Sequence, residues 1–248
     1  MIRDWLPPIL TRPTDLLAVR LARSRFQPVS SWQEAVRCSA GYETLSPAPQ
    51  GTPWRIEGEG RSHAEMQMIA ALGMCVQAVR DRRITVIDLG GGFGHYYGVA
   101  ASSYQTRSWR WSICETPTVV GLARRTSAPA ELDWILRDEA CEEYDVGIAS
   151  GVLQYLQDPH DGLRWLGMSC RFLILNRLPL WEIGCDEIAV QKAAGVLAYP
   201  SWFLSRSLFE EAVKAIGTVC LRWECVEDQA FFAGQRRSYA GMLIRTHA

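Results

Sequence analysis

The sequence predicts an α/β protein built on a largely parallel sheet. Three observations support this fold class: short apolar, β-rich runs recur after residue 83, most intervals between them can hold a crossover helix, and the last two runs are only about ten residues apart. Parallel strands need such crossovers, whereas a short connection favours an antiparallel hairpin. The runs are RITVIDL (83–89), RWSICE (110–115), LDWILR (132–137), YDVGIAS (144–150), RFLILN (171–176), TVCLRWECV (218–226) and RSYAGMLIR (237–245).

Helices are predicted around these strands. Ser62 and Glu65 have the spacing of a capping box, and apolar residues recur with a helical period from Met66 to Val76, so a helix should lead into the first strand. The segment SRSLFEEAVKAIG (205–217) is predicted to form another helix before the final hairpin.

Turn-forming residues cluster between 44 and 61, in TLSPAPQGTPWRIEGEGR. Such a concentration of proline, glycine and serine is typical of a boundary between structural units. Before it, Ser31 and Glu34 have capping-box spacing, which predicts a short helix. We therefore expect residues 1–60 to form a helical appendage or lid, and residues 61–248 to form the main domain.

Length and composition exclude a disordered or fibrous chain. The 248 residues are 48% hydrophobic, which is enough for one sizeable core. Lysine and arginine number 26, aspartate and glutamate 27, and the formal net charge is -1. Because binding to a polyphosphate chain needs an excess of positive charge, we expect no nucleic-acid partner.

The eight cysteines form no C-x-x-C pair and have no close histidine partner. This pattern predicts neither a zinc site nor a disulfide framework, so we expect no metal and a reducing compartment. Asp4, Asp15 and early prolines interrupt the stretch where a secretion signal would be apolar, and no segment nears the roughly 18 apolar residues of a membrane span. We expect a cytoplasmic protein that does not contact a membrane.

The motif DLGGGFG, residues 88–94, follows the first strand directly. Glycines at this turn let the backbone bend sharply and approach a ligand with no Cβ in the way, and the next helix offers its unpaired N–H groups. A nucleotide-like ligand is therefore expected. The motif residues predicted to hold it are Asp88, Gly90, Gly91, Gly92 and Gly94.

Two other glycine-rich nucleotide motifs do not fit. The dinucleotide fingerprint G-x-G-x-x-G needs glycine or alanine at its last position, where the two possible registers have His95 and Tyr97. A P-loop needs Gly-Lys-Ser/Thr, which does not follow. The spacing D-x-G-x-G-x-G resembles the first motif of class I S-adenosylmethionine-dependent methyltransferases.

A carboxylate, Glu115, stands at the end of the second predicted strand. At this point of a doubly wound nucleotide-binding sheet, an acidic side chain accepts hydrogen bonds from the ribose hydroxyls. The alternative is a solvated charge at a helix entry, before Thr116 and Pro117. The glycine turn favours the ribose role, and Thr116 is included in the predicted cofactor site.

Longer stretches extend the resemblance. The runs SWQEAVRCSAGYE (31–43), DVGIASGVLQYL (145–156), RFLILNRLPL (171–180), YPSWFLSRSLFEEAV (199–213) and YAGMLIR (239–245) resemble a group of methyltransferase-like proteins associated with bacterial O-antigen and natural-product gene clusters. Some proteins similar to this group form azetidine-2-carboxylate. The likeness covers most of the chain.

The resemblance implies a Rossmann-like class I methyltransferase fold, with seven strands ordered 3-2-1-4-5-7-6 and S-adenosylmethionine as co-substrate at their carboxyl ends. Residues 61–248 would be the S-adenosylmethionine-binding domain. It also implies a cofactor contact at Ser150 and an adenine contact at Asp138, although Asp138 could equally belong to a plain acidic loop. Asn176 replaces the aspartate of many relatives, and no Asn-Pro-Pro-Tyr run is present, which disfavours base methylation.

A methyl-transfer site must bind a sulfonium cation, exclude water and align the acceptor with the methyl carbon. Aromatic faces stabilise such a cation by about 0.5–2 kcal/mol each, and several aromatic side chains follow strand ends or lie in the segment expected to roof the pocket. His95 follows the glycine motif. It could be a capping or surface residue, or a base that accepts a proton near neutral pH. The predicted catalytic residues are Tyr199, Trp202, Tyr155, Asn176 and His95.

Three functional hypotheses follow. The first is a methyltransferase acting on a small molecule in bacterial secondary metabolism or polysaccharide biosynthesis. The second is cyclisation of S-adenosylmethionine itself to azetidine-2-carboxylate and methylthioadenosine in the same fold. The third is a non-catalytic S-adenosylmethionine-binding protein. In each case a monomer or homodimer with a small-molecule ligand is expected.

Overall fold

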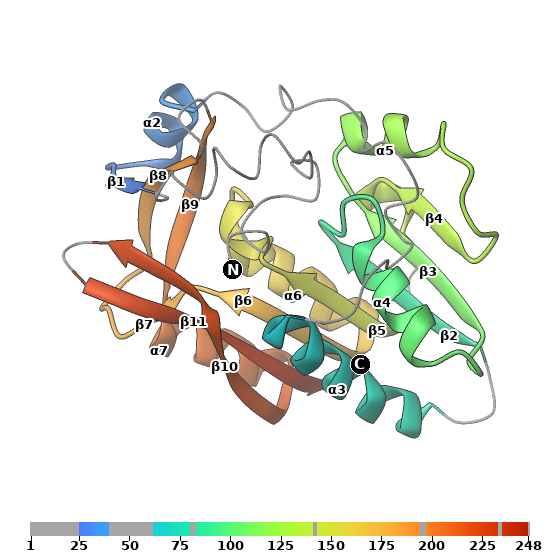
Figure 1. The fold of residues 1–248 in the computed structure, drawn as a ribbon. Helices are drawn as coiled ribbons and strands as arrows, with labels where there is room; N and C mark the ends of the chain where they lie inside the picture. The colour runs from blue at the N-terminus through green and yellow to red at the C-terminus, as the bar shows by residue number, and fades with distance from the viewer. Residues whose placement is uncertain are drawn as a thin grey trace.

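The computed structural model describes residues 25–39, 62–79, 83–140, 143–193, 197–232 and 235–247. A seven-stranded sheet forms its centre (Figure 1). The strands are β2 (Ile84–Leu89), β3 (Trp109–Cys114), β4 (Leu132–Ile135), β5 (Tyr144–Ser150), β6 (Cys170–Leu178), β10 (Gly217–Phe232) and β11 (Gln235–Thr246). Their order is β10-β11-β6-β5-β2-β3-β4. This is the predicted order 3-2-1-4-5-7-6 read from the other edge, so the predicted topology is confirmed.

Strand β2 lies at the centre of the parallel part of the sheet. It pairs in parallel with β3 and β5, and β4 and β6 continue the parallel pairing outward. Strand β11 pairs antiparallel with both β6 and β10. The short connection between β10 and β11 accounts for the hairpin, because a parallel pair would need a longer crossover. All seven predicted strands are present in the predicted directions.

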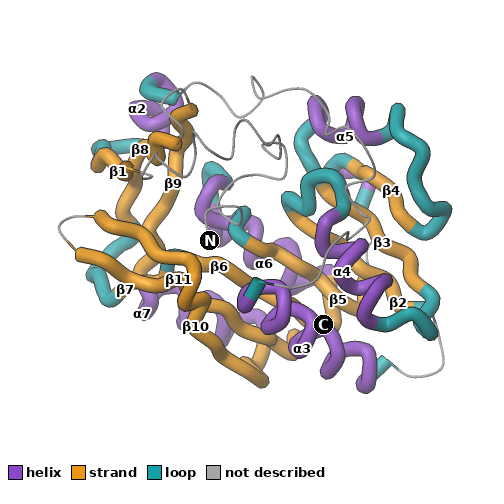
Figure 2. Tube along the Cα trace, in the orientation of Figure 1, coloured by secondary structure: helices purple, strands orange, loops and turns teal. Residues whose placement is uncertain are grey.

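Helices cover both faces of this sheet (Figures 1 and 2). The helices are α2 (Trp32–Arg37), α3 (His63–Ala78), α4 (His95–Ser103), α5 (Pro117–Ala123), α6 (Pro159–Ser169) and α7 (Arg206–Ile216), with 3₁₀ turns η4 (Arg137–Glu139) and η5 (Leu153–Tyr155). Helices α3, α4 and α5 share a core with Val86, whereas α6 and α7 share a second core with Ile87. Neighbouring residues of one strand point to opposite faces, so β2 contributes to both cores.

The predicted helix starts are confirmed. Ser62 Oγ accepts a hydrogen bond from the Glu65 N–H at 3.2 Å, and Glu65 Oε2 accepts one from the Ser62 N–H at 2.7 Å, which completes a capping box at the start of α3. Ser31 caps α2 through the Glu34 N–H. The Glu34 carboxylate differs from the predicted box, because it accepts from Ser30 rather than from Ser31.

A second, four-stranded sheet was not predicted. Its strands are β1 (Arg25–Pro28), β7 (Leu180–Trp181), β8 (Glu187–Ala193) and β9 (Leu197–Ser205), in the order β1-β8-β9-β7. The described part of the N-terminal segment thus holds the predicted helix and also a strand, which pairs antiparallel with β8. The predicted boundary near residue 60 lies outside the described residues and stays a prediction.

The two faces of the second sheet have different neighbours. Ile188 and Val190 pack with Ala35 of α2 on one face, whereas Ala189 and Phe203 pack with the β10–β11 hairpin on the other. This alternation follows from the two-residue repeat of a strand. The second sheet therefore connects the N-terminal helix to the main sheet. Within the described ranges, no helix is both long and apolar enough to cross a membrane.

Candidate functional site

The turn between β2 and α4 adopts a conformation that requires glycine. Gly90, Gly92 and Gly94 have positive φ values of 67°, 57° and 91°. A Cβ on Gly90 would overlap Cγ2 of Val152, in the loop after β5. The turn therefore packs directly against the neighbouring strand end. Since Gly94 is the N-cap of α4 and has no side chain, it leaves the first N–H groups of the helix without a side-chain cap.

Glu115 lies against this turn. Its Oε1 accepts a hydrogen bond from the Gly92 N–H at 3.1 Å, and its Oε2 accepts one from the Thr116 N–H at 2.9 Å. Burial raises the pKa of Glu115, while these two N–H groups oppose the rise. Each oxygen keeps a second lone pair, so the carboxylate can still accept two further hydrogen bonds. The predicted juxtaposition of the glycine turn and the acid is present.

Asp88 lies beneath the turn. Its side chain is only 1% exposed, and a Cβ on Gly91 would overlap its carboxyl group. Burial raises the pKa of Asp88 to about 8; a hydrogen bond from Trp111 lowers it and the nearby Glu115 charge raises it. The Trp111 indole N–H donates to Oδ2 at 3.4 Å, and Oδ1 is buried with no hydrogen-bond partner among the described residues. Asp88 therefore supports the turn from below.

A tryptophan that sequence reasoning missed holds the same turn. The indole N–H of Trp134, in β4, donates to the Gly92 carbonyl at 2.8 Å. Gly92 is thus bonded on its N–H side by Glu115 and on its carbonyl side by Trp134. In the sequence, a tryptophan in an apolar strand predicts only a core residue, so no local signal indicates this contact.

The remaining predicted cofactor residues follow the carboxyl ends of neighbouring parallel strands. Thr116 caps α5 through its hydroxyl, which accepts from the Val119 N–H. Asp138 is exposed in η4, after β4. Ser150 ends β5, and its hydroxyl lies 2.7 Å from the Tyr96 hydroxyl. In open α/β sheets ligands bind at this edge, and the structure brings the predicted residues to it.

His95 begins α4 directly after the glycine turn. It contacts Glu65, which the sequence predicts only as part of the capping box of a helix. Its Nε2 is hydrogen-bonded to Oε1 of Glu65, from the first turn of α3. The His95 side chain is 40% exposed and that of Glu65 15% exposed. A partly exposed imidazole with a carboxylate partner therefore lies next to the glycine turn.

Two of the predicted aromatic residues lie together. The rings of Tyr155 and Tyr199 are in edge-to-face contact with centroids 5.3 Å apart, and the Tyr155 hydroxyl donates to Oε1 of Gln191 at 3.0 Å. Burial raises the pKa of Tyr199 to about 12, so this phenol is neutral near pH 7. The Tyr199 hydroxyl and the Gln191 side-chain nitrogen are buried and have no hydrogen-bond partners in the part of the chain that the structure describes. These residues form an uncharged, polar and aromatic cluster.

Trp202 does not join that cluster. It is three residues from Tyr199 on β9, so the two side chains project from opposite faces of the strand. Its ring stacks with Trp32 at a centroid distance of 6.2 Å, and its indole N–H donates to the Leu156 carbonyl at 3.1 Å. Tyr199 and Trp202, both predicted to be catalytic, therefore lie on different faces of one extended strand.

Asn176, a predicted catalytic residue, is buried and bonded to structural groups. Its side chain is 0% exposed, its amide nitrogen donates to the Ala64 carbonyl at 3.3 Å, and its oxygen accepts from the Trp223 indole at 2.9 Å and the Cys225 thiol at 3.2 Å. These bonds tie β6 to α3 and to β10. The side chain is thus committed to structure and presents no surface to a substrate.

A buried ion pair near the end of β6 was also missed. Arg177 has a positive φ of 56°, and its Nε donates to Asp228 at 2.9 Å. The side chains are 17% and 3% exposed. A non-glycine residue in this conformation is uncommon and turns the chain sharply at the carboxyl edge. The pair adds no net charge to the edge of the sheet, and sequence spacing alone does not indicate it.

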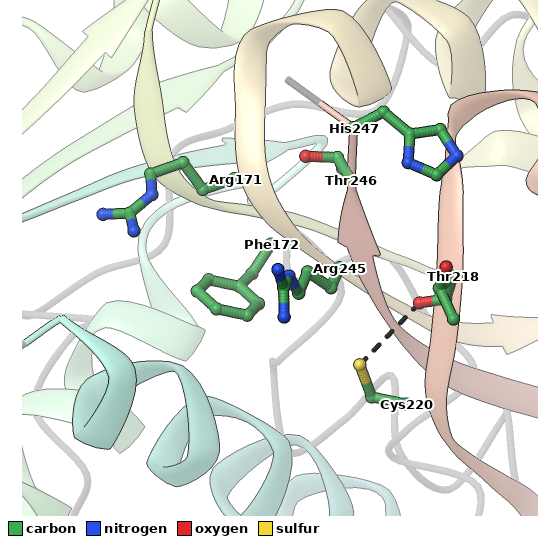
Figure 3. Close-up of a pocket in the computed structure, with 7 residues that line it drawn as sticks. All are labelled: Arg171, Phe172, Thr218, Cys220, Arg245, Thr246 and His247. Atoms are coloured by element: carbon green, nitrogen blue, oxygen red, sulfur yellow. Dashed lines mark hydrogen bonds between the residues drawn. The ribbon is translucent and has the colours of Figure 1, made fainter.

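A separate cavity of about 660 Å³ opens at the amino edge of the main sheet (Figure 3). It is lined by Arg171, Phe172, Thr218, Cys220, Arg245, Thr246 and His247. Phe172 and Arg245 are register partners near the start of β6 and the end of β11. Because the glycine turn follows the carboxyl end of β2, this cavity is not part of the site described above.

Solved structures agree with the topology. The chain is similar to LepI, solved with S-adenosylhomocysteine and a substrate analogue, at 14% identity and a TM-score of 0.51, over 98% of this chain and 64% of that chain. It is less similar to the N-terminal domain of EvdMO1 with S-adenosylhomocysteine bound, at 11% identity and a TM-score of 0.47, over 75% of this chain and 82% of that chain. The chain also resembles human N-acetylserotonin methyltransferase in complex with S-adenosylmethionine, with 16% identity and a TM-score of 0.47 over 74% of this chain and 56% of that chain. No protein-family model and no curated protein matches the sequence.

The chain therefore has the Rossmann-like fold of class I methyltransferases. Because the identities are low, these likenesses establish the fold and not the reaction. The function must be argued from the residues at the carboxyl edge.

Proposed function

We propose that this protein is an S-adenosylmethionine-dependent methyltransferase acting on a small molecule. The observation that carries the proposal is the 3.1 Å contact between the Gly92 N–H and Glu115. It places a carboxylate with two spare lone pairs beside a turn whose backbone can approach a ligand closely, which suits the two hydroxyls of a ribose. S-adenosylmethionine, when bound, supplies an electrophilic methyl group on a positively charged sulfur.

The strand order supports one orientation of the bound ligand along the carboxyl edge of the sheet. Glu115 and Asp138 follow β3 and β4, on one side of β2, whereas Ser150 is the last residue of β5, on the other side. If the adenosine lies over β3 and β4, its sulfur and amino-acid end must extend past the glycine turn toward β5. Tyr96, His95 and the Tyr155–Tyr199 cluster would then line the reacting end, and their aromatic surface would exclude water.

Calorimetric titration with S-adenosylhomocysteine tests the proposal without an acceptor. The wild-type protein should bind, and Glu115→Gln should raise the Kd by about 10–100-fold, because a hydrogen bond to a charged group contributes about 1.5–3 kcal/mol. Glu211→Gln, an exposed change on α7, is the matched control and should leave the Kd unchanged. Equal Kd values for wild type and Glu115→Gln, or no binding by wild type, would contradict the proposal.

The cyclisation alternative has one observation in its favour. The Tyr155 and Tyr199 rings lie together near the carboxyl edge, and aromatic faces stabilise a sulfonium without any acceptor being required. Incubation with S-adenosylmethionine alone separates the two reactions: a cyclase releases methylthioadenosine, whereas a methyltransferase releases S-adenosylhomocysteine only when an acceptor is added. Binding with neither product would support the non-catalytic alternative.

The biological setting is proposed on the sequence resemblance alone. We propose a role in bacterial secondary metabolism or polysaccharide biosynthesis, a cytoplasmic location, and a monomer or homodimer without a nucleic-acid partner. The near-neutral charge of the chain supports the last point, since it offers no excess of cations to phosphates.

A further inference from the structure

We propose that His95 is the proton acceptor of this site, that Glu65 is the positioning residue that orients it, and that the methyl acceptor is a protic group, a hydroxyl or an ammonium. The inference rests on the proposed methyl-transfer function. It deepens that function by naming the class of acceptor and the residue that removes its proton.

The Glu65 carboxylate is held in place before it meets His95. Its Oε2 accepts the Ser62 N–H at 2.7 Å, and its backbone N–H donates to Ser62 Oγ at 3.2 Å, so the capping box restricts the side chain. The other oxygen, Oε1, bonds to Nε2 of His95. Burial raises the pKa of Glu65, but the bonds from His95 and Ser62 outweigh it and lower the value to about 2. The carboxylate is therefore ionised at neutral pH.

An ionised carboxylate only accepts hydrogen bonds, so the proton of a neutral His95 ring must be on Nε2. Nδ1 then carries the lone pair. Within the described residues, His95 makes this bond to Glu65 and an edge-to-face contact with Tyr96 at a centroid distance of 5.5 Å, and its Nδ1 makes no hydrogen bond. A carboxylate that accepts a hydrogen bond from one ring nitrogen fixes the tautomer and the orientation of the histidine.

The pair lies where the reacting end of the ligand is expected. Tyr96, the residue after His95, is hydrogen-bonded to Ser150 at the end of β5. The first turn of α3, which carries Glu65, is bonded to the end of β6 through the Ala64 carbonyl. The pair is therefore on the β5–β6 side of the glycine turn, opposite the strands that carry Glu115 and Asp138.

The step balances without a further reactant. Nδ1 of His95 takes a proton from the acceptor O–H or N–H as the acceptor oxygen or nitrogen forms its bond to the methyl carbon. The carbon–sulfur bond breaks, and its electron pair stays on sulfur. His95 then releases the proton to water. An acceptor without a removable proton, such as a thioether, would have no use for this pair, which is why the geometry points to a protic acceptor.

Nitrogen NMR of ¹⁵N-histidine-labelled protein tests the geometry. The chain has four histidines, so His95→Gln assigns the relevant signals. Wild type and Glu65→Gln, which keeps an oxygen acceptor, should show His95 in the Nε2–H tautomer, whereas Glu65→Ala should show averaged tautomers. The control Asp186→Ala removes the partner of another histidine, His160, and should leave His95 unchanged. Averaged signals for His95 in the wild type would overturn the proposal.

Titration of the same sample with S-adenosylhomocysteine tests the location. The His95 ring signals should shift at saturation, while those of His247, at the opposite edge of the sheet, should not. Calorimetric binding with unmoved His95 signals would overturn this inference and leave the proposed function standing. No calorimetric binding would overturn both.

Kinetics test the chemical role. Catechol and phenethylamine are protic probes, and dimethyl sulfide is an aprotic one. His95→Gln should lower kcat for a protic probe by about 10²–10⁴-fold with the Kd for S-adenosylhomocysteine within twofold of wild type, the range expected for loss of a general base. Glu65→Ala should lower kcat less, and Glu65→Gln should restore part of it. Turnover of dimethyl sulfide alone, or unchanged kcat in His95→Gln, would overturn the proposal.

Discussion

Replacing Gly90 with alanine should lower the free energy of unfolding through two separate effects. At its φ of 67°, a residue with a Cβ is strained by about 1–2 kcal/mol. The new Cβ would also overlap Cγ2 of Val152 and lie 2.8 Å from the Val152 Cβ. Overpacking of this kind typically costs about 1–3 kcal/mol. The expected loss is therefore about 2–5 kcal/mol, combining torsional strain and overpacking.

The partner residue separates the two effects. Val152→Ala removes Cγ2 but leaves the Cβ at 2.8 Å, so in the Gly90→Ala background it should restore only part of the free energy lost through overpacking. Val152→Gly removes both atoms and should restore the remainder of that free energy. The torsional strain of about 1–2 kcal/mol should remain in every variant that carries Gly90→Ala. A double-mutant cycle isolates the contact from the strain.

Urea unfolding, followed by the fluorescence of the ten tryptophans, measures these differences. Calorimetry with S-adenosylhomocysteine on the folded variants should show weaker binding wherever Gly90 is replaced, because the turn must move. The reasoning would be refuted by a Gly90→Ala protein within about 0.5 kcal/mol of wild type, or by a coupling energy with Val152 below about 0.5 kcal/mol.

Three further predictions concern buried polar groups. Burial raises the pKa of Asp88 from 3.8 to about 8, so its contribution to stability is complete below about pH 4 and is lost as the pH rises through about 8. Urea unfolding from pH 5 to 8 should show wild type losing stability relative to Asp88→Asn, and parallel curves would contradict this. Trp134→Phe should cost about 1–3 kcal/mol, because it leaves the Gly92 carbonyl without its 2.8 Å bond. Trp109→Phe, which removes a buried indole N–H that has no partner within the described ranges, is the matched control and should cost less in the same assay. Asn176→Leu should cost about 2–4 kcal/mol in urea unfolding, since it removes bonds to three groups. The Kd of the folded Asn176→Leu protein for S-adenosylhomocysteine should stay within twofold, and weaker binding without lost stability would contradict the structural role of Asn176.

The main sheet was predictable because its signals are local. Each strand is a short apolar run, and the directions follow from the length of the connections. The start of α3 is indicated by Ser62 and Glu65, which cap each other within four residues. The glycine turn and Glu115 were also predictable, because each follows directly from the end of a parallel strand.

Other features could not be predicted, because they depend on residues that are distant in sequence or on which segment becomes a strand. Tyr199 and Trp202 were both predicted to be catalytic, but their segment is a strand and its alternation places the two side chains on opposite faces. Strand β1 exists because β8 pairs with it, and its own four residues carry no strong strand signal. Asn176 was predicted to be catalytic, but its side chain is bonded to three groups that are distant in sequence.

The positions and directions of the strands and the glycine turn were thus encoded in local periodicity and chain connections, whereas the order of the strands was implied by the family resemblance. The partners of the polar side chains were decided only by tertiary packing. Glu65 and His95 are hydrogen-bonded although they are 30 residues apart in sequence, and Trp134 and Gly92 are hydrogen-bonded although they are 42 residues apart. Such contacts depend on how whole elements pack, because a polar side chain can bond only to whatever group the fold brings within hydrogen-bond distance.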